Sequence, residues 1–107
     1  MNLMEYVHVL ALHELPEQGF KPVDVNGTSI LVGRINGQPF AFLDRCPHAG
    51  APLRFGKLRG GELTCTRHGW TFDVSTGEAL PSHPAYRLVQ CPIKIDGTSV
   101  LIIPPFS

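Results

Sequence analysis

Short runs of β-branched and aromatic residues alternate with Gly-containing turns in the first part of this sequence. The runs at 20–25, 28–35 and 38–43 are separated by Asn26-Gly27 and Asn36-Gly37. Asn-Gly between such runs is typical of a hairpin, because a type I′ turn needs positive φ at both central residues. The pattern therefore predicts two successive β-hairpins.

A third hairpin is predicted near the C-terminus, where Asp96-Gly97 joins the run at 86–95 to the run at 98–103. Ile93 and Ile95 in the first of these runs show the period of two expected when one face of a strand is buried. No segment combines helical periodicity with convincing caps. The expected fold class is therefore all-β.

Between residues 44 and 85 the sequence is rich in Gly, Pro, His and Cys, with only brief strand-like pieces at 62–66 and 71–73. A loop-rich region of this length buries little apolar surface and normally needs its own staple. We therefore expect an antiparallel β-sandwich or barrel with a smaller, metal-stapled subdomain inserted at about 44–85. The 107 residues fit one domain, 1–107.

Composition excludes several classes of function. Nine basic and nine acidic side chains leave a formal net charge of +0, which argues against binding to nucleic acid or to a membrane surface. The N-terminus has no basic region followed by an apolar stretch, and the longest apolar runs fall far short of the roughly 20 residues of a membrane span. We expect a cytoplasmic protein. Its three cysteines, an odd count, then favour metal binding or burial over disulfides.

Two short arms carry the candidate chemistry, Cys46-Pro47-His48 and Cys65-Thr66-Arg67-His68, with sixteen residues between them. Thiolates and imidazoles that converge on one point suit zinc or an iron–sulfur cluster. Ordinary zinc fingers pair Cys with Cys and His with His, whereas each arm here is mixed. A two-iron cluster with two chemically distinct irons explains the mixture well, and a structural zinc site is the alternative.

With their flanking residues, Cys46 to Leu53 and Cys65 to Asp73, the arms strongly resemble the C-x-H…C-x-x-H signature of the Rieske family. Thr76-Gly77-Glu78 and the proline loop at 80–84 resemble the segment that closes over the cluster in that family. The resemblance covers essentially the whole chain and implies the Rieske fold and one [2Fe–2S] cluster. It also implies the ligands, which are Cys46 and Cys65 on the inner iron and His48 and His68 on the outer iron.

By the same resemblance, the best match is the ferredoxin of a multicomponent ring-hydroxylating dioxygenase or monooxygenase system of aromatic hydrocarbon catabolism. Such ferredoxins take one electron from a flavin-dependent NAD(P)H reductase and pass it to a terminal oxygenase. Only residues 104–107 follow the last predicted strand, so we expect an electron carrier with no catalytic residues and not an oxygenase. The alternatives are a small Rieske subunit of an assimilatory nitrite reductase and a zinc-stapled, non-redox interaction module.

Several other residues have simpler interpretations. Cys91 is predicted to be a buried, inert thiol, and His83 a solvated residue of the proline loop. Trp70 and Phe72 are expected to pack around the second arm, and Asp73 to hold a turn. Gly50, Gly69 and Gly77 mark loop positions where φ is positive or a Cβ would clash.

Charge is distributed unevenly along the chain. Residues 44–69 contain five cationic side chains against two acidic ones, whereas residues 1–33 contain four acidic side chains against Lys21 alone. The cationic residues are Arg45, Arg54, Lys57, Arg59 and Arg67. Two interpretations are open: the charges lie on ordinary solvated faces, or the cationic cluster end docks on an acidic partner surface. The second interpretation predicts an electron-transfer rate that falls as salt rises.

The redox potential is expected to be low. Rieske proteins of respiratory and photosynthetic complexes have a further cysteine in each arm, and Ala51 and Arg67 stand at the matching positions here. Their serine and tyrosine, whose hydroxyls donate to cluster sulfurs, correspond to Trp70 and Phe72. Because fewer donors stabilise the reduced cluster less, we expect a midpoint around −150 mV, near the low end of the Rieske range.

Overall fold

The computed structural model describes residues 5–48, 50–67, 69–80 and 86–105. Its strands form three antiparallel sheets, with the orders β1-β10-β9, β2-β3-β4 and β5-β6-β7-β8. The elements are β1 (Val7–Ala11), a short 3₁₀ helix (Leu12–Glu14), β2 (Gly19–Val25), β3 (Thr28–Ile35), β4 (Gln38–Leu43), β5 (Lys57–Arg59), β6 (Glu62–Thr64), β7 (Thr71–Asp73), β8 (Ala79–Leu80), β9 (Ile93–Asp96) and β10 (Ser99–Ile102). The predicted all-β class is confirmed.

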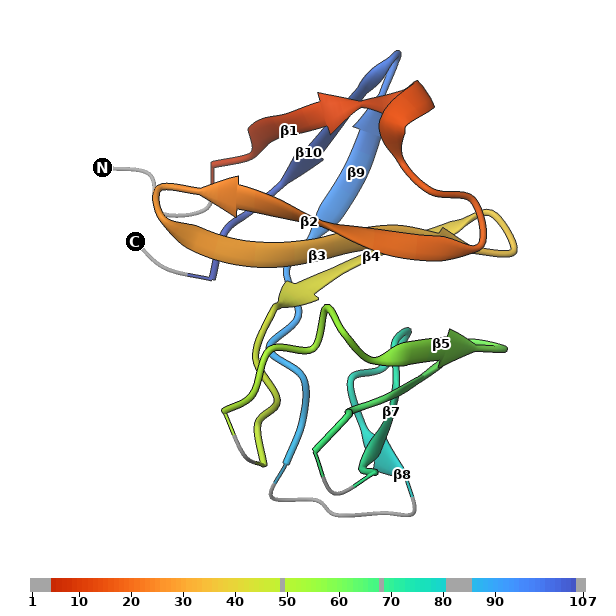
Figure 1. Cartoon of the computed structure of the whole chain (residues 1–107). Helices are drawn as coiled ribbons and strands as arrows, with labels where there is room; N and C mark the ends of the chain where they lie inside the picture. The colour runs from red at the N-terminus through yellow and green to blue at the C-terminus, as the bar shows by residue number, and fades with distance from the viewer. Residues whose placement is uncertain (1–4, 49, 68, 81–85, 106–107) are drawn as a thin grey trace.

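The sheet β2-β3-β4 lies in the middle of the molecule, and consecutive residues of β3 and β4 are buried, so these two strands are covered on both faces. Figure 1 shows β1, β10 and β9 above it and the β5–β8 region below it. Side chains that alternate along a strand point to opposite faces: Ile30 and Val32 join the core shared with β1 and β10, whereas Leu31 joins the core shared with the β5–β8 region. The middle sheet and the sheet of β1, β10 and β9, which together we call the base, thus carry a smaller, loop-rich region that contains β5 to β8.

The two Asn-Gly hairpins form as predicted. Asn26 and Asn36 have φ of 51°, and the glycines that follow them, Gly27 and Gly37, have φ of 86° and 81°. Positive φ at both central residues is what a type I′ turn requires. These local turns set the register of β2, β3 and β4, in which Val25 pairs with Thr28 and Ile35 with Gln38.

The C-terminal hairpin differs from the prediction in two ways. A strand over 86–95 is wrong, because β9 covers only Ile93–Asp96 and the preceding residues contribute two isolated bridges. The turn is shifted by one residue: Asp96 pairs with Ser99, so Gly97 and Thr98 are the loop residues. Gly97 has a φ of 63°, and a glycine at the first loop position fits a type II′ turn.

The structure also differs from smaller details of the sequence-based prediction. Ile95 is 38% exposed, so the period of two at Ile93 and Ile95 does not mark a buried face. The strand predicted at 62–66 ends at Thr64, and β1 was not predicted. No helix among the residues that the structure describes is long and apolar enough to cross a membrane.

Candidate metal centre

The first arm is a tight loop directly after β4. The N–H of Cys46 donates to the carbonyl of Ala51 at 2.7 Å, and the N–H of Gly50 donates to the carbonyl of Cys46 at 2.7 Å. Gly50 has a φ of 73°, a conformation that L side chains rarely adopt. The loop buries Cys46 and brings its side chain into the core shared with the β5–β8 region.

The second arm joins β6 to β7 and repeats this scheme. The N–H of Cys65 donates to the carbonyl five residues later, that of Trp70, at 2.7 Å. A glycine again stands at the fourth position after the cysteine, and Gly69 has a φ of 68°. Both glycine predictions are confirmed, and each arm presents its cysteine on a similarly closed loop.

Asp44 fastens the first arm to the middle sheet, and its role was not predicted from the sequence. Its buried carboxylate accepts hydrogen bonds from the backbone N–H groups of Leu53 (2.7 Å) and Arg54 (2.9 Å) and from the Ser29 hydroxyl (2.9 Å). Arg54 Nε lies 2.7 Å from Asp44 Oδ2 in an ion pair. Both ends of the loop at 44–54 are therefore held on one carboxylate. An acidic residue two positions before the cysteine was the only available clue.

The two cysteines lie close together. Both are 1% exposed. Burial raises the pKa of the Cys65 thiol above its ordinary value, and the neighbouring Cys46 side chain raises it further. The N–H of Arg67 lies 3.4 Å from Cys65 Sγ and opposes this rise in pKa, because it stabilises negative charge on the sulfur. Deprotonating the buried Cys65 thiol is thus a cost that a bound metal offsets.

His48 brings an imidazole from the first arm against the second. Its ring stacks on the indole of Trp70, with the centroids 4.0 Å apart and the planes at 10°. The Nδ1 atom of His48 is buried. The fourth predicted ligand, His68, lies outside the described residues. No group of three or more His, Cys, Asp or Glu side chains within the described part of the chain is arranged around a single metal ion.

Aromatic rings form a wall beside His48. Tyr86 meets the His48 ring edge-on at 5.8 Å and the Trp70 ring at 5.0 Å. Phe72 is fully buried, and its ring centroid lies 6.4 Å from that of Trp70. Trp70 and Phe72 thus pack around the second arm as predicted. Tyr86 was missed because the sequence placed it on a strand.

The remaining candidates lie away from this centre or outside the described residues. Cys91 is 4% exposed in the core of the base, and burial raises its pKa to about 11, which confirms a buried, inert thiol. Asp73 accepts hydrogen bonds from the N–H and hydroxyl of Ser75, at 2.8 and 2.6 Å, and so holds a turn as predicted. His83 and residues 81–84 of the proline loop lie outside the described residues.

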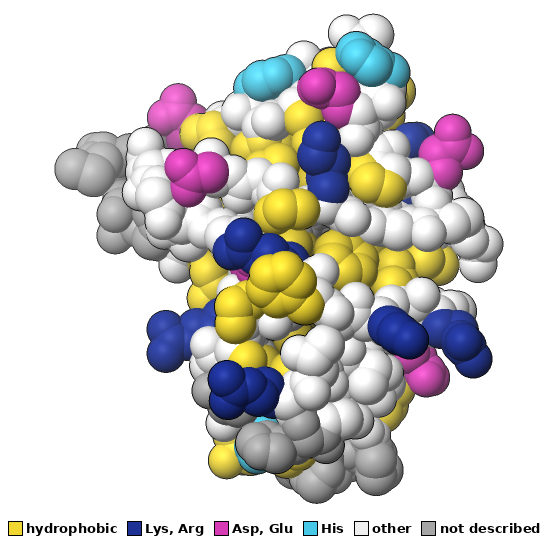
Figure 2. Space-filling model, viewed as in Figure 1, with side chains coloured by type: hydrophobic (Ala, Val, Ile, Leu, Met, Phe, Trp, Pro, Cys, Tyr) yellow, Lys and Arg dark blue, Asp and Glu magenta, His cyan; other side chains and the backbone are white. Residues whose placement is uncertain are grey.

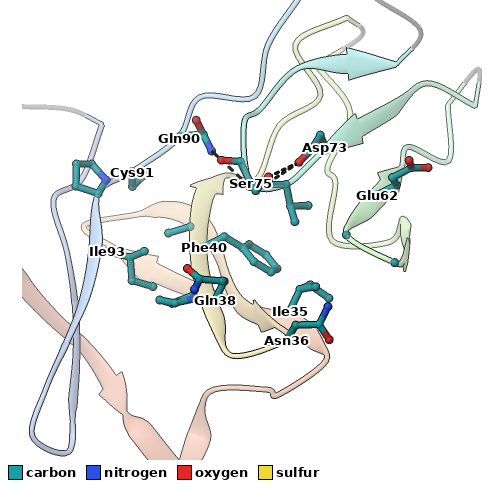
Figure 3. Close-up of a pocket in the computed structure, with 16 residues that line it drawn as sticks. Ile35, Asn36, Gln38, Phe40, Glu62, Asp73, Ser75, Gln90, Cys91 and Ile93 are labelled. Atoms are coloured by element: carbon teal, nitrogen blue, oxygen red, sulfur yellow. Dashed lines mark hydrogen bonds between the residues drawn. The ribbon is translucent and has the colours of Figure 1, made fainter.

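Two hollows flank the β5–β8 region. One, of about 750 Å³, lies between the β3–β4 turn and the segment that carries Asp73 and Ser75, and neither arm cysteine lines it. Figure 3 shows Gln90 beside Ser75 at one edge of this hollow, where the Gln90 side-chain amide donates a hydrogen bond of 3.1 Å to the Ser75 carbonyl. The other, of about 710 Å³, is lined by Cys65 and Thr66 of the second arm. Only this second hollow adjoins the candidate centre.

The donor set fits an iron–sulfur centre. Two buried thiols lie together, the imidazole of His48 in the first arm stacks on Trp70 next to the second arm, and a backbone N–H points at one sulfur. Thiolate ligands with hydrogen bonds to sulfur are characteristic of iron–sulfur sites, and imidazoles replace two of the thiolates in the Rieske type.

Comparisons with known proteins agree with this chemistry. Residues 5–92 match the family model described as Rieske [2Fe-2S] domain. The ferredoxin component of a naphthalene 1,2-dioxygenase system from Pseudomonas aeruginosa is 33% identical over 92% of this chain and 94% of its own length. Among solved structures, the ferredoxin of carbazole 1,9a-dioxygenase from Nocardioides aromaticivorans IC177 is 29% identical, with a TM-score of 0.79 over 92% of this chain and 97% of the ferredoxin.

A third match comes from a solved complex of reduced oxygenase and oxidized ferredoxin in carbazole 1,9a-dioxygenase. The matched chain is 26% identical with a TM-score of 0.81, and the match covers 94% of each chain. The family model spans most of the chain, and the ferredoxin relatives are covered almost from end to end. The chain therefore belongs to the Rieske [2Fe–2S] domain family, whose cofactor is one [2Fe–2S] cluster.

Proposed function

We propose that the chain is a one-electron carrier that receives electrons from a flavin-dependent NAD(P)H reductase and delivers them to a terminal oxygenase. The observation that supports this most directly is the meeting of the two arms, where Cys46 and Cys65 are buried side by side and His48 stacks on Trp70. The similarity to ferredoxin components along nearly their whole length supports an electron-transfer role rather than a catalytic one. The proposed place of work is the cytoplasm.

The proposed ligands are Cys46 and Cys65 on one iron and His48 and His68 on the other. When bound, the cluster accepts and releases one electron. Burial of both cysteines keeps water from the sulfurs. The N–H of Arg67 stabilises the negative charge that sulfur gains on reduction. We further propose that residues 1–107 act as a single Rieske domain whose subdomain at about 44–85 holds the cluster.

The purified protein tests this function directly. We expect two iron and two acid-labile sulfide per chain, a visible absorption spectrum that bleaches on one-electron reduction, and turnover when a reductase and a terminal oxygenase of the same gene neighbourhood are added. Equimolar zinc without iron or sulfide would favour a non-redox interaction module instead. Co-purification with a large reductase would favour a small subunit of a nitrite reductase-like assembly.

A further inference from the structure

The hollow beside the second arm lies next to an exposed aromatic side chain. Phe55 is 67% exposed, although most large apolar side chains in this region are buried. The hollow runs from Phe55 and Lys57 on one side to Cys65 and Thr66 on the other. An exposed aromatic ring beside a recess that reaches a redox centre is a feature of interaction surfaces.

The edge of this hollow is cationic. Lys57 and Arg59 are exposed on β5, and Leu58 between them turns toward the core. Glu62 pairs with Arg59 across the strands and is the acidic residue among those that line the hollow. Figure 2 shows dark blue side chains around a yellow patch on the lower half of the molecule, whereas most magenta side chains lie on the upper half.

Arg54 is also cationic, but its guanidinium is engaged in contacts within the molecule. Its Nε forms the ion pair with the buried Asp44 at 2.7 Å, and its guanidinium carbon lies 5.8 Å from the centroid of the Phe55 ring. Arg54 therefore holds the first arm and supports the Phe55 ring. The Lys57 and Arg59 side chains form no hydrogen bond or ion pair with other described residues, so they are available to a partner.

The floor of the hollow adds hydroxyl donors. Thr64, Thr66 and Thr71 line it, and the Thr64 and Thr71 hydroxyls lie 3.1 Å apart. Ammonium, guanidinium and hydroxyl groups all donate to carboxylates. A complementary surface therefore presents Asp or Glu side chains around an apolar recess that accepts Phe55.

We propose that Phe55, Lys57, Arg59 and Thr66, which we name the Phe55 surface, form the docking site for an acidic patch on the terminal oxygenase. This rests on the carrier function proposed above and identifies the partner chemistry of the same site. Continuity with Cys65 places the docked partner beside the buried sulfur of the second arm. A ferredoxin and an oxygenase form a complex in the carbazole 1,9a-dioxygenase system, which favours the oxygenase over the reductase as the occupant.

The first test needs no protein partner. The reduced holoprotein is oxidised with anionic ferricyanide or with cationic hexaamminecobalt(III), and each second-order rate is followed as ionic strength rises. Because the side chains of the chain sum to a formal net charge of +0, the salt dependence reports charge near the cluster. We expect the ferricyanide rate to fall and the hexaamminecobalt(III) rate to rise. The opposite slopes would overturn a cationic docking surface.

A double variant assigns this charge to residues. Lys57→Gln with Arg59→Gln should reduce the salt dependence with ferricyanide and slow transfer to the oxygenase at low salt about tenfold. Lys21→Gln with Lys94→Gln is the matched control, since both lysines are exposed on the base strands β2 and β9. The control should leave both rates unchanged. Equal effects of the two pairs would show a net-charge effect and overturn the assignment to this surface.

The apolar part of the surface is tested separately. Phe55→Ala should weaken binding to the oxygenase. The dissociation constant of the ferredoxin–oxygenase complex should rise about tenfold at high as well as low salt. Ile95→Ala, which truncates an exposed side chain on β9 of the base, should have no effect. The midpoint potential and visible spectrum should stay unchanged in all variants, which shows that the cluster is intact.

Carbodiimide cross-linking locates the contact. The reagent joins lysine amines to carboxylates, and the chain has three lysines, Lys21, Lys57 and Lys94. With the oxygenase of the same gene neighbourhood, we expect cross-linked peptides that contain Lys57. Cross-links through Lys21 or Lys94 alone would overturn the proposal, as would effects of the Phe55 surface variants confined to reduction by the reductase. A wild-type holoprotein that transfers no electron to the oxygenase would instead contradict the proposed carrier function.

Discussion

The base and the cluster-binding region of this molecule are stabilised in different ways. In the base, β2 and β3 pair at seven positions, and β1, β3, β4 and β10 enclose a core of aliphatic side chains. In the cluster-binding region, β5–β6 pair at three positions and β7–β8 at two. Strands this short add little stability of their own.

Polar and metal-binding groups supply what the short strands lack. Asp44 holds the first arm through four donors, and the two arm cysteines are buried members of the core beneath the middle sheet. The comparison indicates that the base folds on apolar burial, whereas the cluster-binding region needs the cluster and one buried carboxylate to keep its loops closed.

Removal of a proposed cysteine ligand should separate the two regions most clearly. Cys46→Ala or Cys65→Ala should abolish the cluster, and His48→Ala or His68→Ala should do the same or leave a damaged centre, because metal-binding energy is also folding energy. Iron and sulfide analysis with hydrogen exchange should show loss of protection at residues 50–67 and 69–80 while β3 and β4 stay protected. Cys91→Ala should retain full colour. A fully loaded Cys46→Ala protein would exclude Cys46 as a ligand.

Asp44→Ala should produce the next largest effect, a loss of about 3 kcal/mol in the free energy of unfolding, because Leu53 N–H and other donors lose their buried acceptor. Urea denaturation of the holoprotein measures it. Ser29→Ala removes a single donor to the same carboxylate and should cost about 1 kcal/mol. Equal losses in the two variants would refute Asp44 as the anchor of the first arm.

The potential should respond to a hydroxyl added beside the arms and not to one added elsewhere in the same core. The wild-type midpoint is expected around −150 mV. Phe72→Tyr should raise it by roughly 50–100 mV if the new hydroxyl reaches a cysteine sulfur, because about 59 mV corresponds to 1.4 kcal/mol for one electron. Phe40→Tyr, the same change on β4, should leave it unchanged. Voltammetry near neutral pH is the measurement, and a wild-type value above about +100 mV would contradict the low-potential assignment.

Asp73 should give the smallest effect. Its pKa is lowered below 3.8, first by the Ser75 hydroxyl and also by backbone N–H groups, so the ionised carboxylate stabilises the turn after β7. Asp73→Ala should cost about 1 kcal/mol at neutral pH. Because the folded pKa is lowered, this contribution is present above about 3.8 and is lost only as pH falls below that value. Urea unfolding at pH 7 and pH 4.5 should give the same difference from wild type, and a smaller difference at pH 4.5 would contradict the lowered pKa.

Local chemistry allowed the hairpins and the arms to be predicted from the sequence. Asn26-Gly27 and Asn36-Gly37 adopt positive φ for reasons contained within two residues, so β2, β3 and β4 follow almost to the residue. The mixed Cys–His arms were recognisable because metal ligands cluster along the chain. Family membership and the cluster follow from these arms and their flanks.

The strand predicted from the sequence was wrong at residues 86–92. The sequence reads there as a strand, yet the chain makes isolated bridges at Arg87 and Gln90 and pairs regularly only from Ile93. Strand formation depends on a continuous partner edge, and here the neighbouring edges belong to β4 and to the turn before β8. Tyr86 is thus left beside Trp70 rather than in a sheet.

The sequence by itself therefore determined the all-β class, the tight turns and the two arms with their cysteines and histidines, because each depends on residues close together in the chain. Only the tertiary structure decided that Asp44 anchors the first arm, that Tyr86 and Trp70 flank His48, and that Phe55 and Lys57 edge a hollow beside Cys65. Each of these depends on contacts between segments distant in sequence, which no local pattern encodes.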